Sequence, residues 1–247
     1  MVLDKLLELL ITIIQILLAV NLKNGKKLWS FQSGKRIIGT PAVSEGIVVF
    51  GSADRNIYGL NAENGQLLWK VVAQEPVIGA VTIDNGLAYV GASDHTLRAI
   101  DIHTGKVVWS YDKVKGYIET KPLVTDNKVI FGAWDNTLYA LDKNDGKEIW
   151  KWTGGLTRMH FSPAAVWPVA AEGKVFIADP QRALTAIDIH NGETVWRTFE
   201  SQVRETVGLS EDAERIYSKT MNDSIVCYAT ESNAPKKLWA SNVGFGY

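Results

Sequence analysis

Cysteine is almost absent from this chain of 247 residues, in which Cys227 is the only thiol. One cysteine cannot form a disulfide within the chain, so a small disulfide-stabilised fold is excluded. Cys227 lies in Ser224-Ile-Val-Cys-Tyr228, an apolar run that predicts an inner strand, and we interpret it as a small buried hydrophobic residue. The low cysteine content leaves the compartment open, because exported and cytoplasmic proteins both occur with so few thiols.

The chain also lacks an excess of charge of either sign. Lysine and arginine total 26, aspartate and glutamate total 27, and the formal net charge is −1. Without a basic field, binding to nucleic acid is not expected. Apolar residues make up 46% of the composition, which is typical of a soluble globular protein with a sizeable core.

Motifs that carry catalysis or bind metals are missing from the sequence. It contains no zinc-type spacing of His and Cys, no glycine-rich nucleotide loop and no Gly-x-Ser-x-Gly turn. The four histidines form no ligand cluster, and His103 and His190 occupy the same position of a recurring turn, where solvated residues are the simpler interpretation. We therefore expect no catalytic residue, no metal site and no cofactor, and hence a protein that is not an enzyme.

One short phrase ending in tryptophan recurs five times. The copies are Asn21-Leu-Lys-Asn-Gly-Lys-Lys-Leu-Trp29, Asn61-Ala-Glu-Asn-Gly-Gln-Leu-Leu-Trp69, Asp101-Ile-His-Thr-Gly-Lys-Val-Val-Trp109, Asp142-Lys-Asn-Asp-Gly-Lys-Glu-Ile-Trp150 and Asp188-Ile-His-Asn-Gly-Glu-Thr-Val-Trp196. A degraded sixth copy ends at Trp239. The tryptophans follow one another at intervals of 40, 40, 41, 46 and 43 residues, a period that indicates stacked or radially arranged repeats.

Each repeat predicts four short strands. In the unit that ends at Trp69, apolar runs at 40–43, 47–50 and 57–60 alternate with turn clusters, and the outer strand follows Asn64-Gly65. Four-stranded antiparallel units of this length are blades of a β-propeller, so the expected fold is all-β. We expect the large indoles to dock each blade on its neighbour and the turn glycines to allow the signature turn. These structural positions are Trp69, Trp109, Trp150, Trp196, Gly65, Gly105, Gly146 and Gly192.

The phrase resembles the tryptophan-docking motif of pyrroloquinoline-quinone-type (PQQ-like) propeller repeats, with the pattern Ala-x-Asp-x-x-Thr-Gly-x-x-x-Trp. The segment from Ala99 to Trp109 matches it almost letter for letter, and the resemblance covers residues 21–247. Quinone-dependent dehydrogenases on this fold use adjacent cysteines and a calcium ion. Because this chain has no second cysteine, that part of the family pattern is not carried over.

Blade counting and the first twenty residues leave alternatives open. Five complete units point to a piece of a seven- or eight-bladed ring, with closure of five blades as the alternative. Residues 1–20 are strongly apolar and lie outside the repeat domain of residues 21–247. We expect an N-terminal apolar helix packed on the propeller or on a partner, with a signal peptide and a membrane anchor as alternatives.

The interval between Trp150 and Trp196 is longer because of extra residues in 151–163. In a propeller, loops at this point of the unit lead into the innermost strand at the mouth of the central channel, and binding concentrates on such loops. The alternative is a longer connector with solvated charges. The candidate binding residues are Arg36, Lys115, Glu119, Arg158, His160, Trp167, Arg204 and Glu205.

The segment 158–169 is similar to propeller domains attached to bacterial calcineurin-like metallophosphoesterases, although their metal motifs do not occur in this chain. The function expected first is a non-catalytic scaffold that binds a protein or a cell-envelope ligand through its loop face. The alternative is an accessory propeller of a larger enzyme, either a phosphoesterase or a degenerate quinoprotein. The expected compartment is the bacterial periplasm or cell envelope, with the cytoplasm as the alternative; membrane association would run through residues 1–20, and the oligomeric state is open.

Overall fold

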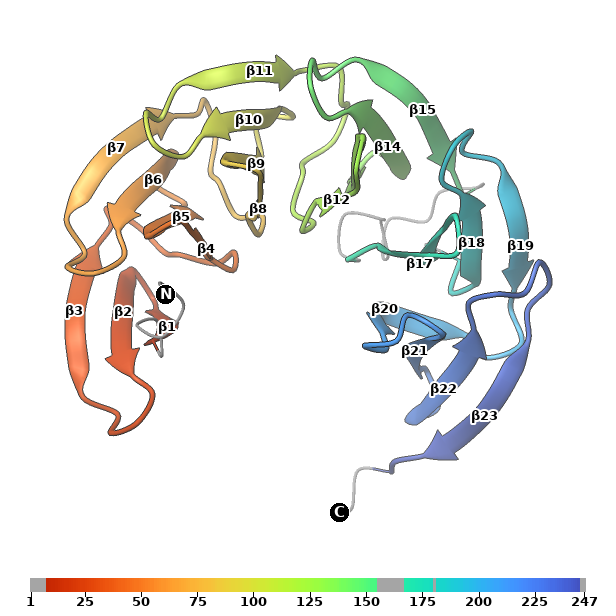
Figure 1. Ribbon diagram of the computed structural model, residues 1–247. Coiled ribbons are helices and arrows are strands. Elements are labelled where there is room, and N and C mark those ends of the chain that lie inside the picture. Colours follow the sequence, from red (N-terminus) through yellow and green to blue (C-terminus); the bar gives the residue numbers. More distant parts are fainter. Residues whose placement is uncertain (1–7, 155–166, 180, 245–247) are drawn as a thin grey trace. The chain divides into compact units, whose positions relative to one another are not determined.

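The computed structural model describes residues 8–154, 167–179 and 181–244, and among these the side chains other than those of 8–13, 205 and 206. The chain forms two compact units, Met1–Lys113 (unit 1) and Val114–Tyr247 (unit 2), each of which is described by itself. All regular elements in the described residues are β-strands of antiparallel sheets (Figure 1). The predicted all-β class with four-stranded units is confirmed.

Unit 1 contains three sheets, in each of which neighbouring strands follow one another along the chain. The first sheet consists of β1 (Glu8–Ile13), β2 (Ile16–Asn21) and β3 (Lys27–Gln32). The second consists of β4 (Ala42–Ser44), β5 (Ile47–Gly51), β6 (Asn56–Asn61) and β7 (Leu67–Val72). The third consists of β8 (Thr82–Asp84), β9 (Leu87–Gly91), β10 (Leu97–Asp101) and β11 (Val107–Tyr111).

Unit 2 contains three sheets of four strands with the same topology. Its first sheet consists of β12 (Leu123–Val124), β13 (Lys128–Ala133), β14 (Thr137–Asp142) and β15 (Glu148–Thr153). The next consists of β16 (Val169–Ala171), β17 (Lys174–Ala178), β18 (Leu184–Asp188) and β19 (Thr194–Thr198). The last consists of β20 (Val203–Leu209), β21 (Arg215–Thr220), β22 (Ser224–Ala229) and β23 (Lys237–Asn242).

The strands of one sheet differ in how far their side chains are buried. The second strand of the second sheet, β5, is buried along its whole length, whereas the outer strand β7 buries Trp69 and leaves Leu67 and Leu68 exposed. The second sheet packs between the first and the third, so both faces of β5 are covered and it carries a continuous apolar run from Ile47 to Phe50. The outer strand needs only the indole, so its other positions tolerate polar residues.

The N-terminal helix expected over residues 1–20 is wrong for residues 8–20. These residues form β1 and most of β2, and β2 pairs with β3 so that Leu17 and Ala19 are fully buried. A continuous apolar run does not by itself distinguish a helix from a buried strand. Here the free edge of β3 favours a strand, because its backbone groups would stay unpaired if these residues formed a helix. Residues 1–7 lie outside the described residues.

The described residues therefore contain five four-stranded sheets and one three-stranded sheet. The three-stranded sheet precedes the five four-stranded ones, because β1 and β2 belong to the same sheet as β3. Membership of a seven- or eight-bladed ring stays a prediction.

Candidate functional site

Each signature phrase forms a tight turn in front of the outer strand. In the 61–66 turn, the Gly65 amide donates to the Asn61 carbonyl at 2.8 Å and the Asn61 amide donates to the Gln66 carbonyl at 2.9 Å. The Asn61 side chain accepts from the Glu63 amide at 2.9 Å, and Gly65 adopts a φ of +72°. This turn thus needs a side-chain oxygen at its first position and a residue that tolerates positive φ at its fifth.

Four of the tryptophans that follow these turns reach the next sheet of their unit. Each indole Nε1–H donates to a backbone carbonyl at the equivalent turn of that sheet. The bonds join Trp29 to Ala62 (2.8 Å), Trp69 to Ile102 (2.6 Å), Trp150 to Ile189 (3.0 Å) and Trp196 to Ser232 (3.2 Å). These four indoles are 6–9% exposed. Each therefore joins two neighbouring sheets by apolar burial and one buried hydrogen bond.

The turn glycine is the receptor for the preceding indole. A Cβ atom at Gly65 would lie 2.6 Å from Trp29, at Gly105 2.7 Å from Trp69, and at Gly192 2.8 Å from Trp150. Separations this short are repulsive, so the ring occupies the space that a side chain would fill. The two other structural positions named from the sequence are also buried: Trp109 is 8% exposed and lies beside Tyr89, and Gly146 belongs to the equivalent turn of unit 2.

A recurring carboxylate, which sequence reasoning missed, forms a second link. Aspartate at the turn before the third strand accepts a backbone N–H from 20 residues earlier: Asp54 from Gly34 (2.7 Å), Asp94 from Gln74 (3.0 Å) and Asp135 from Lys115 (2.9 Å). The same carboxylates accept from Tyr58 Oη (2.7 Å), Arg98 Nη2 (2.5 Å) and Tyr139 Oη (2.6 Å), respectively. The intervals of 40 and 41 residues between these aspartates repeat the spacing of the tryptophans and could have revealed them.

The electrostatics of this link follow from its geometry. Burial acts to raise the pKa of Asp54, but the hydrogen bonds that it accepts, first from Tyr58 and then from Asn56, outweigh burial and hold the pKa below its ordinary value. Burial, followed by the bond to the Asp54 carboxylate, raises the pKa of Tyr58 to about 12. The pair is thus held as a carboxylate and a neutral phenol, which is a structural arrangement rather than an acid–base pair poised near pH 7.

The candidate binding residues lie on the loops before the innermost strands, termed here the inner loops. In unit 1, Arg36 is exposed between β3 and β4. In unit 2, Lys115 is exposed and Glu119 half-buried before β12, Trp167 is 46% exposed before β16, and Arg204 is half-buried at the start of β20. Arg158 and His160 lie outside the described residues, as does the side chain of Glu205. The structure brings none of the described candidates into direct contact with another through a hydrogen bond or an ion pair.

Trp167 nevertheless has a partner on a neighbouring inner loop. Lys121 Nζ lies over its ring, 5.3 Å from the centroid, in a cation–π contact. The inner loop before β12 also carries Tyr117, which is 51% exposed, and its carbonyl accepts from the amide of Trp134, which is 37% exposed, at 2.9 Å. Unit 2 thus presents three partly exposed aromatic side chains on backbone tied to its inner loops. We call Tyr117, Trp134 and Trp167 the aromatic surface.

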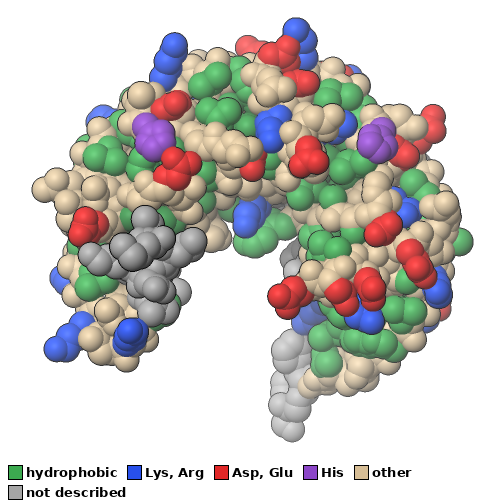
Figure 2. Space-filling view, viewed as in Figure 1, with side chains coloured by type: hydrophobic (Ala, Val, Ile, Leu, Met, Phe, Trp, Pro, Cys, Tyr) green, Lys and Arg blue, Asp and Glu red, His purple; other side chains and the backbone are tan. Residues whose placement is uncertain are grey.

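Two members of the aromatic surface, Tyr117 and Trp134, were missed from the sequence, although a signal exists. Trp134 takes the place of Ala53 and Ser93 before the recurring aspartate. Because the amides of Ala53 and Trp134 bond to the carbonyls of Arg36 and Tyr117, respectively, Tyr117 is the counterpart of Arg36. Aromatic residues where other repeats carry small or charged ones mark a departure that packing within the sheet does not require. Figure 2 shows how apolar side chains alternate with charged ones over the face in view.

Within residues 8–154, 167–179 and 181–244, no group of three or more His, Cys, Asp or Glu side chains could hold a metal ion. No helix long and apolar enough to cross a membrane occurs in the same ranges.

A family model described as outer membrane protein assembly factor BamB matches residues 15–151 and 112–241. The chain belongs to the BamB family. Its match begins within the hairpin of β1 and β2, which agrees with the placement of β2 inside the repeat structure. The resemblance to PQQ-like repeats is thereby confirmed. The likeness of segment 158–169 to phosphoesterase-attached propellers lies mostly outside the described residues and stays a prediction.

Solved structures of similar fold include BamB from Moraxella catarrhalis, with 21% identity, a TM-score of 0.73, and coverage of 93% of this chain and 69% of that one. A computationally designed protein, Ika8, has 20% identity, a TM-score of 0.76 and coverage of 94% and 73%. A europium-containing methanol dehydrogenase has 11% identity, a TM-score of 0.74 and coverage of 95% and 69%. At these identities the likeness shows the fold. No curated protein matched the chain.

Proposed function

We propose that this BamB-family chain is a non-catalytic scaffold that binds a protein component of the bacterial cell envelope through the inner loops of unit 2. The observation that carries the proposal is the aromatic surface, in which Tyr117, Trp134 and Trp167 are 37–51% exposed. Tyrosine and tryptophan contribute much of the binding free energy at protein interfaces, because they bury a large area at a small cost in side-chain entropy.

The backbone under this surface is held in place before any partner binds. The Trp134 amide is bonded to the Tyr117 carbonyl, and Lys121 lies over Trp167. The Lys115 amide is bonded to the Asp135 carboxylate, next to Trp134 in the same turn. A preorganised surface loses less conformational entropy on binding, which raises affinity. Lys121 places positive charge over the Trp167 ring and favours an acidic group on the partner.

A cross-linking experiment tests this proposal. A photoreactive residue at position 117 should capture an envelope protein from the native host, and the purified partner should bind the unmodified chain. Trp134→Ala and Trp167→Ala should each weaken that binding by at least about tenfold, the loss typical of an interface hot spot. Leu68→Ala, which removes a side chain of similar exposure (48%) in unit 1, serves as the matched control.

Two results would contradict the proposal. One is the absence of any envelope protein cross-linked from position 117. The other is a partner whose affinity is unchanged by both tryptophan variants, since the aromatic surface would then contribute nothing to binding.

A further inference from the structure

The two end sheets of the described chain carry complementary halves of the tryptophan joint. Trp239, on the outer strand β23, is 44% exposed, whereas its five counterparts in the other outer strands are 6–9% exposed. No residue that the structure describes accepts a hydrogen bond from its indole N–H. The Trp239 side chain nevertheless has the position of its counterpart Trp109. Its ring centroid lies 6.0 Å from that of Tyr217 in the second strand of the same sheet, and the ring centroids of Trp109 and Tyr89 lie 5.9 Å apart.

The turn of residues 21–26 in unit 1 is the other half. Its Gly25 amide donates to the Asn21 carbonyl at 2.8 Å and its Asn21 amide to the Lys26 carbonyl at 2.9 Å, as in the 61–66 turn. Gly25 has a φ of +69°, close to the +72° of Gly65. The 21–26 turn thus has the same backbone geometry as the turns that hold an indole.

This receptor is empty among the described residues of its unit. A Cβ atom at Gly25 would have no heavy atom within 4 Å, whereas a Cβ at Gly65 would meet Trp29 at 2.6 Å. The residue that would offer the accepting carbonyl, Leu22, is 50% exposed, whereas its counterpart Ala62 is 2% exposed. The face that binds tryptophan in the other turns is therefore open.

The receptor turn is basic, whereas the sheet of Trp239 carries an acidic turn. The two lysines beside Trp239 are paired, Lys236 with Glu231 and Lys237 with Glu200. The receptor turn carries Lys23, Lys26 and Lys27, and the sequence has no acidic residue between Glu8 and Glu45. The sheet of Trp239 exposes a carboxylate cluster in the turn between β20 and β21, and Figure 2 shows acidic side chains gathered over this sheet. The cluster consists of Glu211, Asp212 and Glu214.

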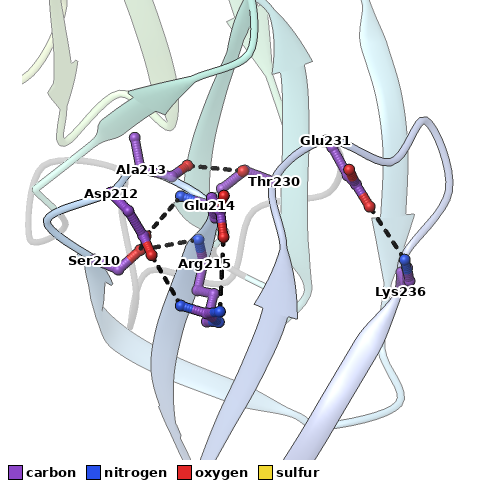
Figure 3. A network of polar contacts seen from close by, with 8 residues as sticks. All are labelled: Ser210, Asp212, Ala213, Glu214, Arg215, Thr230, Glu231 and Lys236. Carbon is purple, nitrogen blue, oxygen red and sulfur yellow. Dashed lines mark hydrogen bonds and ion pairs between the residues drawn. The ribbon is translucent and has the colours of Figure 1, made fainter.

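Hydrogen bonds hold this acidic turn in one conformation. Thr230 Oγ1 donates to the Ala213 carbonyl at 2.8 Å and the Thr230 amide donates to the Glu214 carbonyl at 3.0 Å, which ties the turn to the end of β22 (Figure 3). Arg215 pairs with Asp212 at 3.0 Å. Arg215 also pairs with Glu214 at 3.6 Å, so one arginine faces the three acidic residues of this turn and a net negative charge remains to attract a basic turn.

We propose that Trp239 of one copy of this chain docks on the Asn21–Lys26 turn of a second copy, giving a head-to-tail association. The joint reproduces the contacts of Trp29 with Ala62 and Gly65, with the Leu22 carbonyl as acceptor. Each copy offers one indole and one receptor that differ from each other, so the contact is heterologous and extends to closed or open assemblies.

Sedimentation velocity over a range of concentrations tests the proposal. The 27.3 kDa chain should form species of twice its mass or more, which weaken as salt is raised because opposite charges meet at the joint. Trp239→Ala and Gly25→Ala should each weaken the association at least about tenfold, the first by removing the indole and the second by filling its receptor. Leu68→Ala, which removes an apolar side chain of similar exposure (48%) from an outer strand of unit 1, should leave the association unchanged.

Mixing the two variants provides the decisive test. The Trp239→Ala chain keeps an intact receptor and the Gly25→Ala chain keeps an intact indole, so a mixture should regain a dimer that neither variant forms alone. A chain that stays monomeric up to about 100 μM would overturn the proposal. So would variants that associate like the unmodified chain, or a mixture that stays monomeric. Because Gly25 and Trp239 lie in different units, misfolding of one variant leaves the other as a test.

Discussion

The contact between an indole and a turn glycine joins one sheet to the next, and Gly105→Ala tests it directly. Gly105 has a φ of +71°, and its Cβ would lie 2.7 Å from Trp69 Cγ and 2.8 Å from Cδ2. An alanine there meets two penalties: the left-handed backbone conformation, about 1 kcal/mol, and the repulsion by the ring, about 1–3 kcal/mol. The control Gly86→Ala meets only the first, because Gly86 has a φ of +75° and no heavy atom within 4 Å among the described residues.

The difference between the two variants isolates the docking contact. Urea unfolding at low micromolar concentration, followed by tryptophan fluorescence, should give free energies of unfolding that differ by about 1–3 kcal/mol, with Gly105→Ala the less stable. Part of that loss comes from the Trp69 Nε1–H bond to the Ile102 carbonyl, now 2.6 Å, which lengthens when the ring is displaced. Equal destabilisation of the two variants would refute the assignment of Gly105 as a receptor for Trp69.

Two further predictions concern buried ionisable groups. Burial acts to raise the pKa of Asp94, but the bonds from Arg98 and from the Gln74 amide lower it below its ordinary value. The carboxylate therefore stabilises the fold above about pH 4, and this contribution is lost as the pH falls through the folded-state pKa. In urea titrations at pH 2–6, the fall in unfolding free energy toward low pH, the acid limb, should be flatter for Asp94→Asn than for the unmodified chain. Cys227 is fully buried and burial raises the pKa of its thiol, so native protein should react with Ellman's reagent at least about a hundredfold more slowly than urea-unfolded protein.

Each of these predictions has a clear contrary result. An acid limb that is identical in Asp94→Asn and the unmodified chain would show that the carboxylate is not selectively stabilised in the folded state. Rapid labelling of Cys227 without loss of structure would show that β22 opens far more readily than its burial indicates.

Local spacing carries most of the predictable part of this fold. The interval of about 40 residues, the Asn-Gly or Thr-Gly turns and the apolar runs between them indicate four-stranded units, and the strands lie within a few residues of their predicted positions. These features are readable because turn chemistry and strand propensity act over a few residues. Site prediction was less complete, since Trp167 was identified, but Lys121, which contacts its ring, and the exposed Tyr117 and Trp134 were not.

The failures share a physical origin. Residues 8–20 look helical in isolation. They form strands because β2 pairs with the otherwise free edge of β3, and this pairing buries Leu17 and Ala19 in the core. The repeat spacing marks the recurring aspartates, but it does not show their role, because each one binds an amide 20 residues away. Partners of this kind are determined by how one sheet packs on the next.

The sequence by itself determined that the chain is built of repeated four-stranded units, where their turns lie and which large side chain closes each unit. Only the tertiary structure decided which of the phrase-ending tryptophans are buried and that Trp239 is exposed. Trp29 and Trp239 end the same type of phrase, yet one is 7% and the other 44% exposed. The reason is that burial of an indole depends on the surface placed against it, and that surface belongs to another part of the chain or to another molecule.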